Sequence, residues 1–306
     1  MSVHIHMVPA LNIRILSVCN DNYSNKRLLE ASRLRGHNAS VVHTLFHTLS
    51  DQNLDFFDNQ YNVDAVIPRI GGPLSNFGSA VIKSFESEHI FSTSSSYGIA
   101  TSMDKFLTTQ VLAANSLPVL KTITLAQQQH IDDVIRYLGG YPIVLKLLSG
   151  SQGKSVIYID NAVTGKSLIQ SMINARQAFL VQEFVKEAGG ADIRCLVVGG
   201  RVVAAMKRQG AEGEFRSNLH RGGSAEVVKL TKVERETAVN AAKVMGLHVC
   251  GVDLLRSQNG PMVMEVNSSP GLEGIEKATG KDVASMVFEF IEKNAKPNST
   301  KTRGKG

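Results

Sequence analysis

The sequence predicts an α/β protein, and three observations carry that prediction. Over the first 95 residues, short apolar runs alternate with stretches of helical periodicity, which is typical of a parallel α/β unit. Farther along, two alternating runs at residues 191–198 and 201–207 flank Gly199-Gly200 and predict a β-hairpin. The composition, 43% hydrophobic and 20% charged in 306 residues, is that of a globular chain long enough for two or three domains.

The N-terminal part is expected to form a small parallel sheet. Its strands are read at residues 12–18, 40–44 and 65–68, and its helices at residues 25–36 and 76–85. No GxGxxG follows the first strand, so the sequence does not favour a dinucleotide site. Arg69 comes directly after the third strand, at the edge where open α/β sheets bind ligands. It is a candidate to face a substrate carboxylate, with an exposed loop arginine as the equal alternative.

The rest of the chain continues to mix strands and helices. Thr231 and Glu234 have the spacing of a capping box at the start of one helix. The elements expected after the first domain are helix 95–115, strand 141–148, helix 163–176, strand 178–182, the hairpin 191–207, a polar loop 215–223, helix 231–246 and helix 281–294.

Composition excludes several classes of protein. No apolar run reaches the roughly 18 residues of a membrane span, and the start lacks the features of a secretory signal. Three widely separated cysteines favour reduced thiols over disulfides or metal ligands, and we expect a cytoplasmic protein. The net charge of +6 favours acidic partners, and the basic residues after 295 predict a solvated, disordered tail.

Residues 249–271 contain the strongest chemical signal in the chain. Asp253, Glu265 and Asn267 lie within two strand-like apolar runs, where a buried carboxylate needs a cation, an ion pair or several donors. Glu265 and Asn267 are two residues apart and therefore share a face of the strand. A ligand set made only of oxygen atoms suits Mg²⁺ or Mn²⁺ rather than zinc. The alternative is a hairpin whose polar side chains simply face solvent.

The metal interpretation requires a particular strand register. Asp253 joins the other two ligands only if it lies opposite Glu265. We therefore expect Ser257 opposite Pro261 and a three-residue loop, 258–260, that ends in a glycine. A two-residue turn at residues 259–260 would instead turn Asp253 to the other face of the hairpin.

A lysine and a Gly-rich loop lie together earlier in the chain. Lys146 stands within the apolar run YPIVLKLL and should meet an anion or an acidic side chain, unless its strand is half-exposed. The following loop, residues 149–155, ends in GKS but has Leu148 where a P-loop needs glycine. Its backbone N–H groups could still close over phosphates. A simple turn is the alternative.

Four segments together resemble a known family. IPRIGG, QEFVKEAGGADIRCLVVG, EFRSNLHRGG and MEVNSSPGLEGIEKATG look like signatures of the RimK subfamily of ATP-grasp glutamate ligases, in the order and spacing of that family. The resemblance covers about residues 12–294, although the loop SGSQGKS departs from the more Gly-rich form expected there. It implies an α/β (α+β) architecture, an ATP-grasp fold preceded by a small parallel α/β pre-ATP-grasp domain.

The resemblance also implies a division of the chain. The expected parts are a flexible leader at 1–11, a pre-ATP-grasp domain at 12–95, an ATP-grasp domain at 96–294 and a disordered basic tail at 295–306. Within the ATP-grasp domain, a lid subdomain is expected at about 120–182 and a metal-binding subdomain at about 183–294. The loop at 149–155 is the candidate tip of the lid, which would exclude water from a hydrolysable intermediate.

By the same resemblance, three sets of side chains form the site. The ATP-binding set consists of Lys105 and Lys146 at the phosphates, Glu183 and Phe184 at the adenine, Asp192 at the ribose, and Arg216, Ser217 and Asn218 at the triphosphate. The metal ligands are Asp253, Glu265 and Asn267. The catalytic set is Arg194 and Arg208, which would meet the transferred phosphate or substrate carboxylates.

The implied activity is an ATP-dependent carboxylate-amine ligation. L-glutamate would be added to the C-terminus of a protein, a small-subunit ribosomal protein by the family's example, through an acylphosphate with release of ADP and phosphate. The cofactors are ATP and two Mg²⁺ or Mn²⁺ ions. A homo-oligomer, with a tetramer possible, is expected, without membrane attachment or a need for direct nucleic-acid binding. The alternatives are a ligase of free amino acids or small peptides, like glutathione synthetase or a poly-glutamate synthetase, and a catalytically silent nucleotide sensor or ribosome-binding module.

Overall fold

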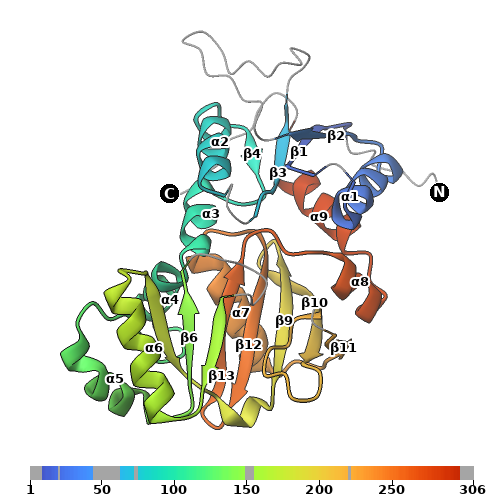
Figure 1. Ribbon diagram of the computed structural model, residues 1–306. Coiled ribbons are helices and arrows are strands. Elements are labelled where there is room, and N and C mark those ends of the chain that lie inside the picture. The colour runs from blue at the N-terminus through green and yellow to red at the C-terminus, as the bar shows by residue number, and fades with distance from the viewer. Residues whose placement is uncertain are drawn as a thin grey trace.

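The computed structural model describes residues 9–19, 21–43, 63–71, 75–148, 155–219 and 222–296. Within them the chain forms three sheets with helices packed around them (Figure 1). Most of the predicted leader, nearly all of the candidate lid loop (149–154) and the tail from residue 297 lie outside the described residues. In the described part of the chain, no helix combines the length and apolar character that crossing a bilayer requires.

The N-terminal sheet is parallel, as predicted. Its strand order is β2-β1-β3-β4, and each neighbouring pair runs in the same direction. Helices α1 and α2 follow β1 and β3. The elements are β1 (Asn12–Ser17), α1 (Tyr23–Leu34), β2 (Asn38–His43), β3 (Ala65–Arg69), α2 (Ser75–Ser87) and β4 (Phe91–Ser92).

The prediction of a single helix over residues 95–115 is wrong. Two helices, α3 (Ser96–Met103) and α4 (Lys105–Ala114), meet at Asp104, which adopts an extended conformation with φ −90° and ψ 108°. The Asp104 carboxylate accepts hydrogen bonds from the backbone N–H groups of Phe106 and Leu107 at 2.8 and 3.0 Å. An aspartate used as an N-cap starts a new helix, so the chain changes direction immediately before Lys105.

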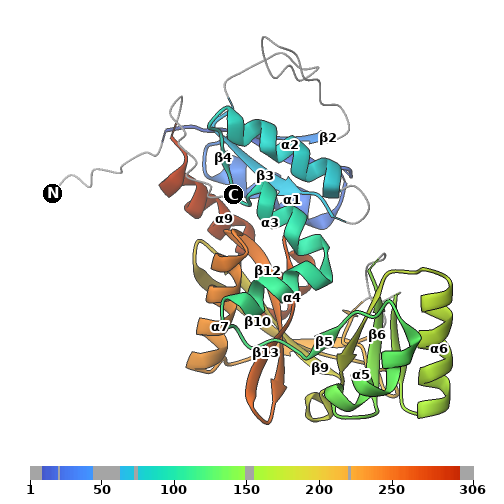
Figure 2. The ribbon, with the colours of Figure 1, turned by 90° about the vertical axis from the view of Figure 1, so that its left-hand side faces the viewer.

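A second, antiparallel sheet follows with the order β5-β8-β6-β7. Apolar side chains of α5 and α6 pack on one of its faces together with Ile143, Leu145 and Val181. In Figure 2 this sheet and its two helices form the part at the right of the picture. The elements are β5 (Thr122–Ile123), a 3₁₀ turn η2 (Gln128–His130), α5 (Ile131–Leu138), β6 (Ile143–Leu147), β7 (Val156–Ile159), α6 (Ala162–Asn174) and β8 (Phe179–Glu183).

The third sheet is also antiparallel and has the order β11-β10-β9-β12-β13. Its helix α7 begins with the predicted capping box, in which Thr231 and Glu234 bond reciprocally. The predicted hairpin around Gly199-Gly200 is present as β9 and β10. The elements are η3 (Lys186–Ala188), β9 (Ala191–Val198), β10 (Arg201–Gln209), β11 (Ser224–Val227), α7 (Lys232–Val244), β12 (Val249–Ser257), β13 (Gly260–Asn267), α8 (Glu273–Thr279) and α9 (Val283–Asn294).

The last helix returns to the start of the chain. Apolar residues of α9, among them Phe288 and Ile291, share one buried cluster with Ile13 and Ile15 of β1, and α9 lies beside α1 in Figure 1. A salt bridge between Arg27 of α1 and Glu276 of α8 is a second link between the two ends of the described chain. The two ends of the described chain are therefore packed into one core, which fixes the N-terminal sheet against the C-terminal one.

Side chains on the strands of the third sheet alternate between its two faces, which separates polar from apolar residues. Cys195 and Val197 of β9 and Val252 of β12 pack in the cluster that contains α7. Residues one position away point to the opposite face, because successive side chains on a strand alternate. Arg194 of β9 and Asp253 of β12 therefore share the face that α7 leaves uncovered, and this face carries the candidate site.

Candidate functional site

The β12–β13 hairpin places Asp253 opposite Glu265, as the metal interpretation required. The predicted loop is nevertheless wrong, because Ser257 lies opposite Gly260 and the connection has two residues, Gln258 and Asn259. The offset comes from an irregularity in the ladder, where Asp253 pairs with Glu265 but the next residue, Leu254, pairs with Val263. A β-bulge, and not a three-residue loop, therefore places Asp253 opposite Glu265.

The bulge lies at Met264, the residue of β13 that the ladder skips. Val263 and Val266, an odd number of residues apart, both pack in the α7 cluster. A regular strand would turn one of them away, so the extra residue returns the alternation to phase. Glu265 and Asn267 consequently face the same side as Asp253.

Asp253 is the centre of a buried ionic network. It is 1% exposed, and its carboxylate accepts two hydrogen bonds from Arg194, at 2.7 and 2.6 Å, and one from Arg208, at 2.7 Å. Arg208 also donates from Nε and Nη2 to the two oxygens of Asp192, at 2.7 and 2.5 Å. Ser217 donates to Asp192 at 2.6 Å. The guanidinium of Arg208 on β10 therefore bridges Asp192 on β9 and Asp253 on β12, three adjacent strands of the sheet.

The network keeps its charges despite burial. Burial raises the pKa of Asp253, but the charges and hydrogen bonds of Arg194 and Arg208 outweigh it and lower that pKa to about 2. Burial lowers the pKa of Arg208, and the two aspartates more than reverse this, so its pKa is raised. For Asp192, burial and then the charge of Asp253 raise the pKa against the pull of Arg208 and Ser217. Asp253 and Arg208 are therefore held in their charged forms at the centre of the network.

The candidate metal ligands differ in accessibility. Glu265 is exposed, and Asn267 is half-buried with its Oδ1 accepting from the Ser269 backbone N–H at 2.9 Å. No three His, Cys, Asp or Glu side chains gather in the described ranges, so a cation would need the amide oxygen as its third ligand. Two carboxylates and an amide fit a hard divalent cation. A carboxylate accepts about four hydrogen bonds, so the three at Asp253 leave it room for one further contact.

Lys146 belongs to the same region. Ile143 and Leu145 of β6 pack toward α5 and α6, so Lys146 points to the other face of the β5-β8-β6-β7 sheet, which falls in the predicted lid and is named the lid sheet. Burial lowers the pKa of Lys146 to about 8, with Glu265 and Asp253 opposing the change and Lys105 reinforcing it. These four side chains are thus close enough to interact, although they come from three separate parts of the chain. The sequence predicts that Lys146 meets an anion or an acidic side chain, and the charges of Glu265 and Asp253 both act on it.

The segment predicted to hold adenine contains an unsatisfied acceptor. Gln182 is buried next to Glu183 and Phe184, and its Oε1 has no hydrogen-bond partner while its Nε2 donates to Thr122 Oγ1 at 2.8 Å. Glu183 Oε1, expected to accept from adenine, accepts from the backbone N–H of Lys121 at 2.8 Å. A buried oxygen without a partner is costly, and a ligand amine would satisfy it. Sequence reasoning missed Gln182.

Phe184 belongs to an aromatic cluster that joins the lid sheet to the polar loop after β10. Its ring lies 5.0 Å from that of Tyr158, and the Tyr158 ring lies 5.5 Å from that of Phe215. The guanidinium of Arg216 packs over Phe215 at 5.1 Å. It also donates to the carbonyl of Val156 at 3.3 Å. These contacts connect the lid sheet to the loop that carries the predicted triphosphate residues.

Arg216 is held by a neighbour that sequence reasoning also missed. Glu214 accepts from Arg216 Nε and Nη2, both at 2.7 Å, and Ser217 is turned toward Asp192. Asn218 is half-buried beside them. The spacing of Glu214 and Arg216 was visible in the sequence, but nothing in it indicates that two residues of an irregular loop turn to the same side. The ATP roles of these residues, like that of Asp192, remain predictions.

Two family models together match most of this chain. Residues 102–291 match the family model of the RimK-like ATP-grasp domain, and residues 11–99 match that of the RimK PreATP-grasp domain. A protein of Teredinibacter turnerae named probable alpha-L-glutamate ligase is 54% identical over 308 residues, covering 97% of this chain and all of the relative. Its namesake from Vibrio atlanticus is 51% identical, with the same coverage.

Solved structures share the fold at low sequence identity. The ATP-grasp ligase PsnB complexed with minimal precursor has a TM-score of 0.75 at 20% identity, covering 92% of this chain and 99% of PsnB. D-alanine–D-alanine ligase from Bacillus anthracis has a TM-score of 0.66 at 17% identity, covering 93% and 98% of the two chains. The predicted architecture, a parallel α/β unit followed by an ATP-grasp fold, is confirmed.

Proposed function

Because the chain belongs to the RimK family of ATP-grasp ligases, we propose that it adds L-glutamate to the C-terminal carboxylate of a protein at the expense of ATP. The observation that carries the proposal is the placement of Asp253 and Glu265 opposite each other, within electrostatic reach of Lys146. Relatives at about 50% identity over the full chain are named as alpha-L-glutamate ligases, which supports glutamate as the amine substrate.

The reaction has two steps. A carboxylate oxygen of the acceptor attacks the γ-phosphorus of ATP, the bond from that phosphorus to the β–γ bridging oxygen breaks, and ADP leaves. The glutamate amine then attacks the acyl carbon, a C–N bond forms, the bond to the phosphate oxygen breaks, and inorganic phosphate leaves while the nitrogen loses a proton. Both steps depend on positioning and on positive charge near the phosphates rather than on a covalent nucleophile.

The side chains of this protein supply that positioning. Arg194 and Arg208 each use Nε and Nη2 to hold aspartates, so Nη1 is the end of each guanidinium left for a phosphate or carboxylate oxygen. Asp192 and Asp253 fix the planes of these guanidiniums before a substrate arrives, which is the preorganisation that transition-state stabilisation needs. Lys146 would meet the phosphates from the lid sheet, together with Lys105.

A divalent cation would be held by Glu265, Asn267 and the remaining acceptor capacity of Asp253. Such a cation would supply positive charge to offset the negative charge of the phosphates. Both Mg²⁺ and Mn²⁺ suit oxygen ligands. Gln182 Oε1 would accept from the exocyclic amine of adenine, a role that its unpaired, buried oxygen supports better than the engaged carboxylate of Glu183.

The acceptor is proposed to be a small-subunit ribosomal protein. Net charge supports an acidic acceptor, because a chain of +6 attracts acidic C-termini and growing glutamate tails. Mass spectrometry of purified ribosomal proteins after incubation with the enzyme, ATP, Mg²⁺ and L-glutamate tests this directly. Products should differ by whole glutamyl residues, and ADP release should require glutamate and acceptor together.

The matched control is Glu265→Gln, which keeps the shape of an exposed side chain while removing one proposed ligand charge. It should release no ADP under the same conditions. Turnover with free amino acids alone would favour the small-molecule ligase instead. Absence of ADP release with every amino acid tried, despite measurable ATP binding, would refute ligation and favour a nucleotide sensor.

A further inference from the structure

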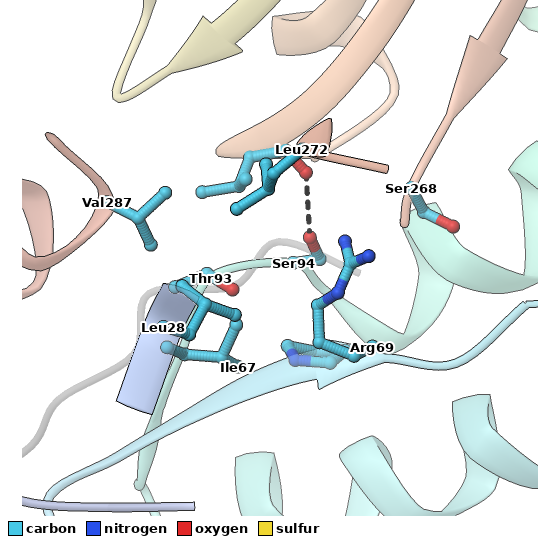
Figure 3. A pocket seen from close by; sticks show the side chains of 10 residues that line it. Leu28, Ile67, Arg69, Thr93, Ser94, Ser268, Leu272 and Val287 are labelled. Atoms are coloured by element: carbon cyan, nitrogen blue, oxygen red, sulfur yellow. Dashed lines mark hydrogen bonds between the residues drawn. The ribbon is translucent and has the colours of Figure 1, made fainter. Parts of the chain in front are cut away.

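Arg69 ends β3 and lines a pocket between the N-terminal sheet and the loop that follows β13 (Figure 3). Its Nη1 donates to the carbonyl of Pro270 at 2.6 Å. Its Nε is buried and has no hydrogen-bond partner. Thr93, Ser94 and Ser268 also line the pocket with polar side chains, while Leu28 and Val287 belong to its apolar wall. A guanidinium with an enclosed, unused donor faces this pocket.

The charge of Arg69 is not balanced as that of Arg208 is. Burial lowers the pKa of Arg69 to about 10, and no carboxylate opposes the change. Arg208, in contrast, lies between Asp192 and Asp253, which raise its pKa. In the described part of the chain Arg69 has no ion-pair partner at all. An enclosed cation without a counter-ion is expensive, and an anionic ligand would relieve the cost.

The pocket adjoins the site already described. Pro270 comes three residues after Asn267, and a Cβ added at Gly251 would lie 3.2 Å from Pro270 Cβ and 3.6 Å from Arg194 Nε. Gly251 is therefore a shared neighbour of Arg194 and of Pro270, whose carbonyl Arg69 holds. The loop that follows β13 is tied to the N-terminal half of the chain, since Ser102 donates to Ser268 at 2.9 Å. Arg69 thus reaches the site from the opposite domain.

We propose that Arg69 binds a carboxylate of the incoming amino acid and so selects glutamate as the amine. This rests on the proposed function and assigns one substrate group of that reaction. The pocket is narrow, so it would receive the carboxylate end of the substrate and not the whole amino acid. Nε and Nη2 form one edge of the guanidinium and can hold a carboxylate with two parallel hydrogen bonds, while Nη1 keeps Pro270.

The two carboxylate substrates need different partners. The acceptor carboxylate becomes phosphorylated, so it must lie beside the phosphates, where Arg194, Arg208 and Lys146 are. The incoming amino acid keeps its carboxylates through both steps and presents only its amine to the acyl carbon. It therefore needs a cation that is near the reacting centre and not engaged with phosphate. Arg69 meets both conditions.

The test compares two amines with the wild type and Arg69→Gln. Glutamine keeps a donor for the Pro270 carbonyl and removes the charge and the paired donors. Hydroxylamine attacks the same acylphosphate to give a hydroxamate and phosphate, but it has no carboxylate. We expect the KM for L-glutamate to rise roughly tenfold or more in Arg69→Gln. The KM for ATP, the Mg²⁺ dependence and hydroxamate formation should stay near wild-type values.

The same substitution at Arg33, an exposed residue of α1, is the matched control and should leave all four quantities unchanged. An equal loss of hydroxamate and glutamyl product would overturn the proposal, because Arg69 would then serve the acceptor or the metal loop. An unchanged KM for glutamate would overturn it too. Should the wild type fail to use glutamate, the proposed function falls. Arg69's role as a carboxylate site then also falls unless glutamate raises the melting temperature of the wild type and not of Arg69→Gln.

Discussion

Replacing Asp253 by asparagine probes the ionic network at its centre. The substitution keeps the shape of the side chain but removes the charge that Arg194 and Arg208 share. It also turns an amide N–H₂ toward one of the two guanidiniums, where only an acceptor fits. Both effects should destabilise the fold, because a cation is left buried and a donor faces a donor.

The pKa of Asp253 gives the size of the charge effect. Its lowering from 3.8 to about 2 corresponds to about 2 kcal/mol of folding free energy. The misplaced amide adds roughly 1 to 2 kcal/mol, so Asp253→Asn should lose about 3 to 4 kcal/mol at pH 7. Because the pKa of the folded state is lowered, this stabilisation is complete above the unfolded-state pKa near 4. It is lost as the pH falls toward 2.

Urea unfolding followed by circular dichroism measures the difference. The gap between wild type and Asp253→Asn should be constant from pH 8 to about 5 and narrow only below about 4. Asp160→Asn, which removes an exposed carboxylate, should stay within about 0.5 kcal/mol of wild type. A gap for Asp253→Asn no larger than that of Asp160→Asn at pH 7 would refute the reasoning, since the network would then contribute nothing to the fold.

Four further outcomes follow from the site. The affinity of the wild type for ATP should fall as the pH rises through about 8, where Lys146 loses its proton in the free protein. Lys146→Arg should keep its affinity for ATP at higher pH, because arginine stays charged. Equal pH profiles of the two proteins in a nucleotide titration would contradict this. Glu265→Ala should abolish ADP release but change the free energy of unfolding by less than about 0.5 kcal/mol, because the side chain is exposed. A parallel loss of stability would show that Glu265 has a structural role. Gln182→Leu should weaken ATP binding roughly tenfold with little change in the melting temperature, and unaltered binding would place adenine elsewhere. Glu214→Gln should weaken the hold on Arg216, which also donates to Val156, and should tighten ATP binding severalfold. Weaker binding would show that the carboxylate orients the guanidinium toward the phosphates.

Local patterns in the sequence determine several elements of this fold. Short apolar runs that alternate with helical stretches predicted the parallel N-terminal sheet, and two alternating runs around Gly199-Gly200 predicted the β9–β10 hairpin. The spacing of Thr231 and Glu234 predicted the start of α7. These features depend on neighbouring residues, which the sequence states directly. The position of Lys146 amid apolar residues indicated a charge that needed partners, and the partners interact with it as expected.

The tertiary structure decided which groups meet. The sequence could place Asp253, Arg194 and Arg208 on strands, but only the strand order brings the three together, because each comes from a different strand of one sheet. The bulge at Met264 was invisible for the same reason, since it corrects the phase of β13 against α7 and not against its own turn. Arg69 is placed beside the site by its hydrogen bond to the carbonyl of Pro270, about 200 residues later in the chain. Contacts between distant segments follow from how whole faces pack, and no local spacing encodes them.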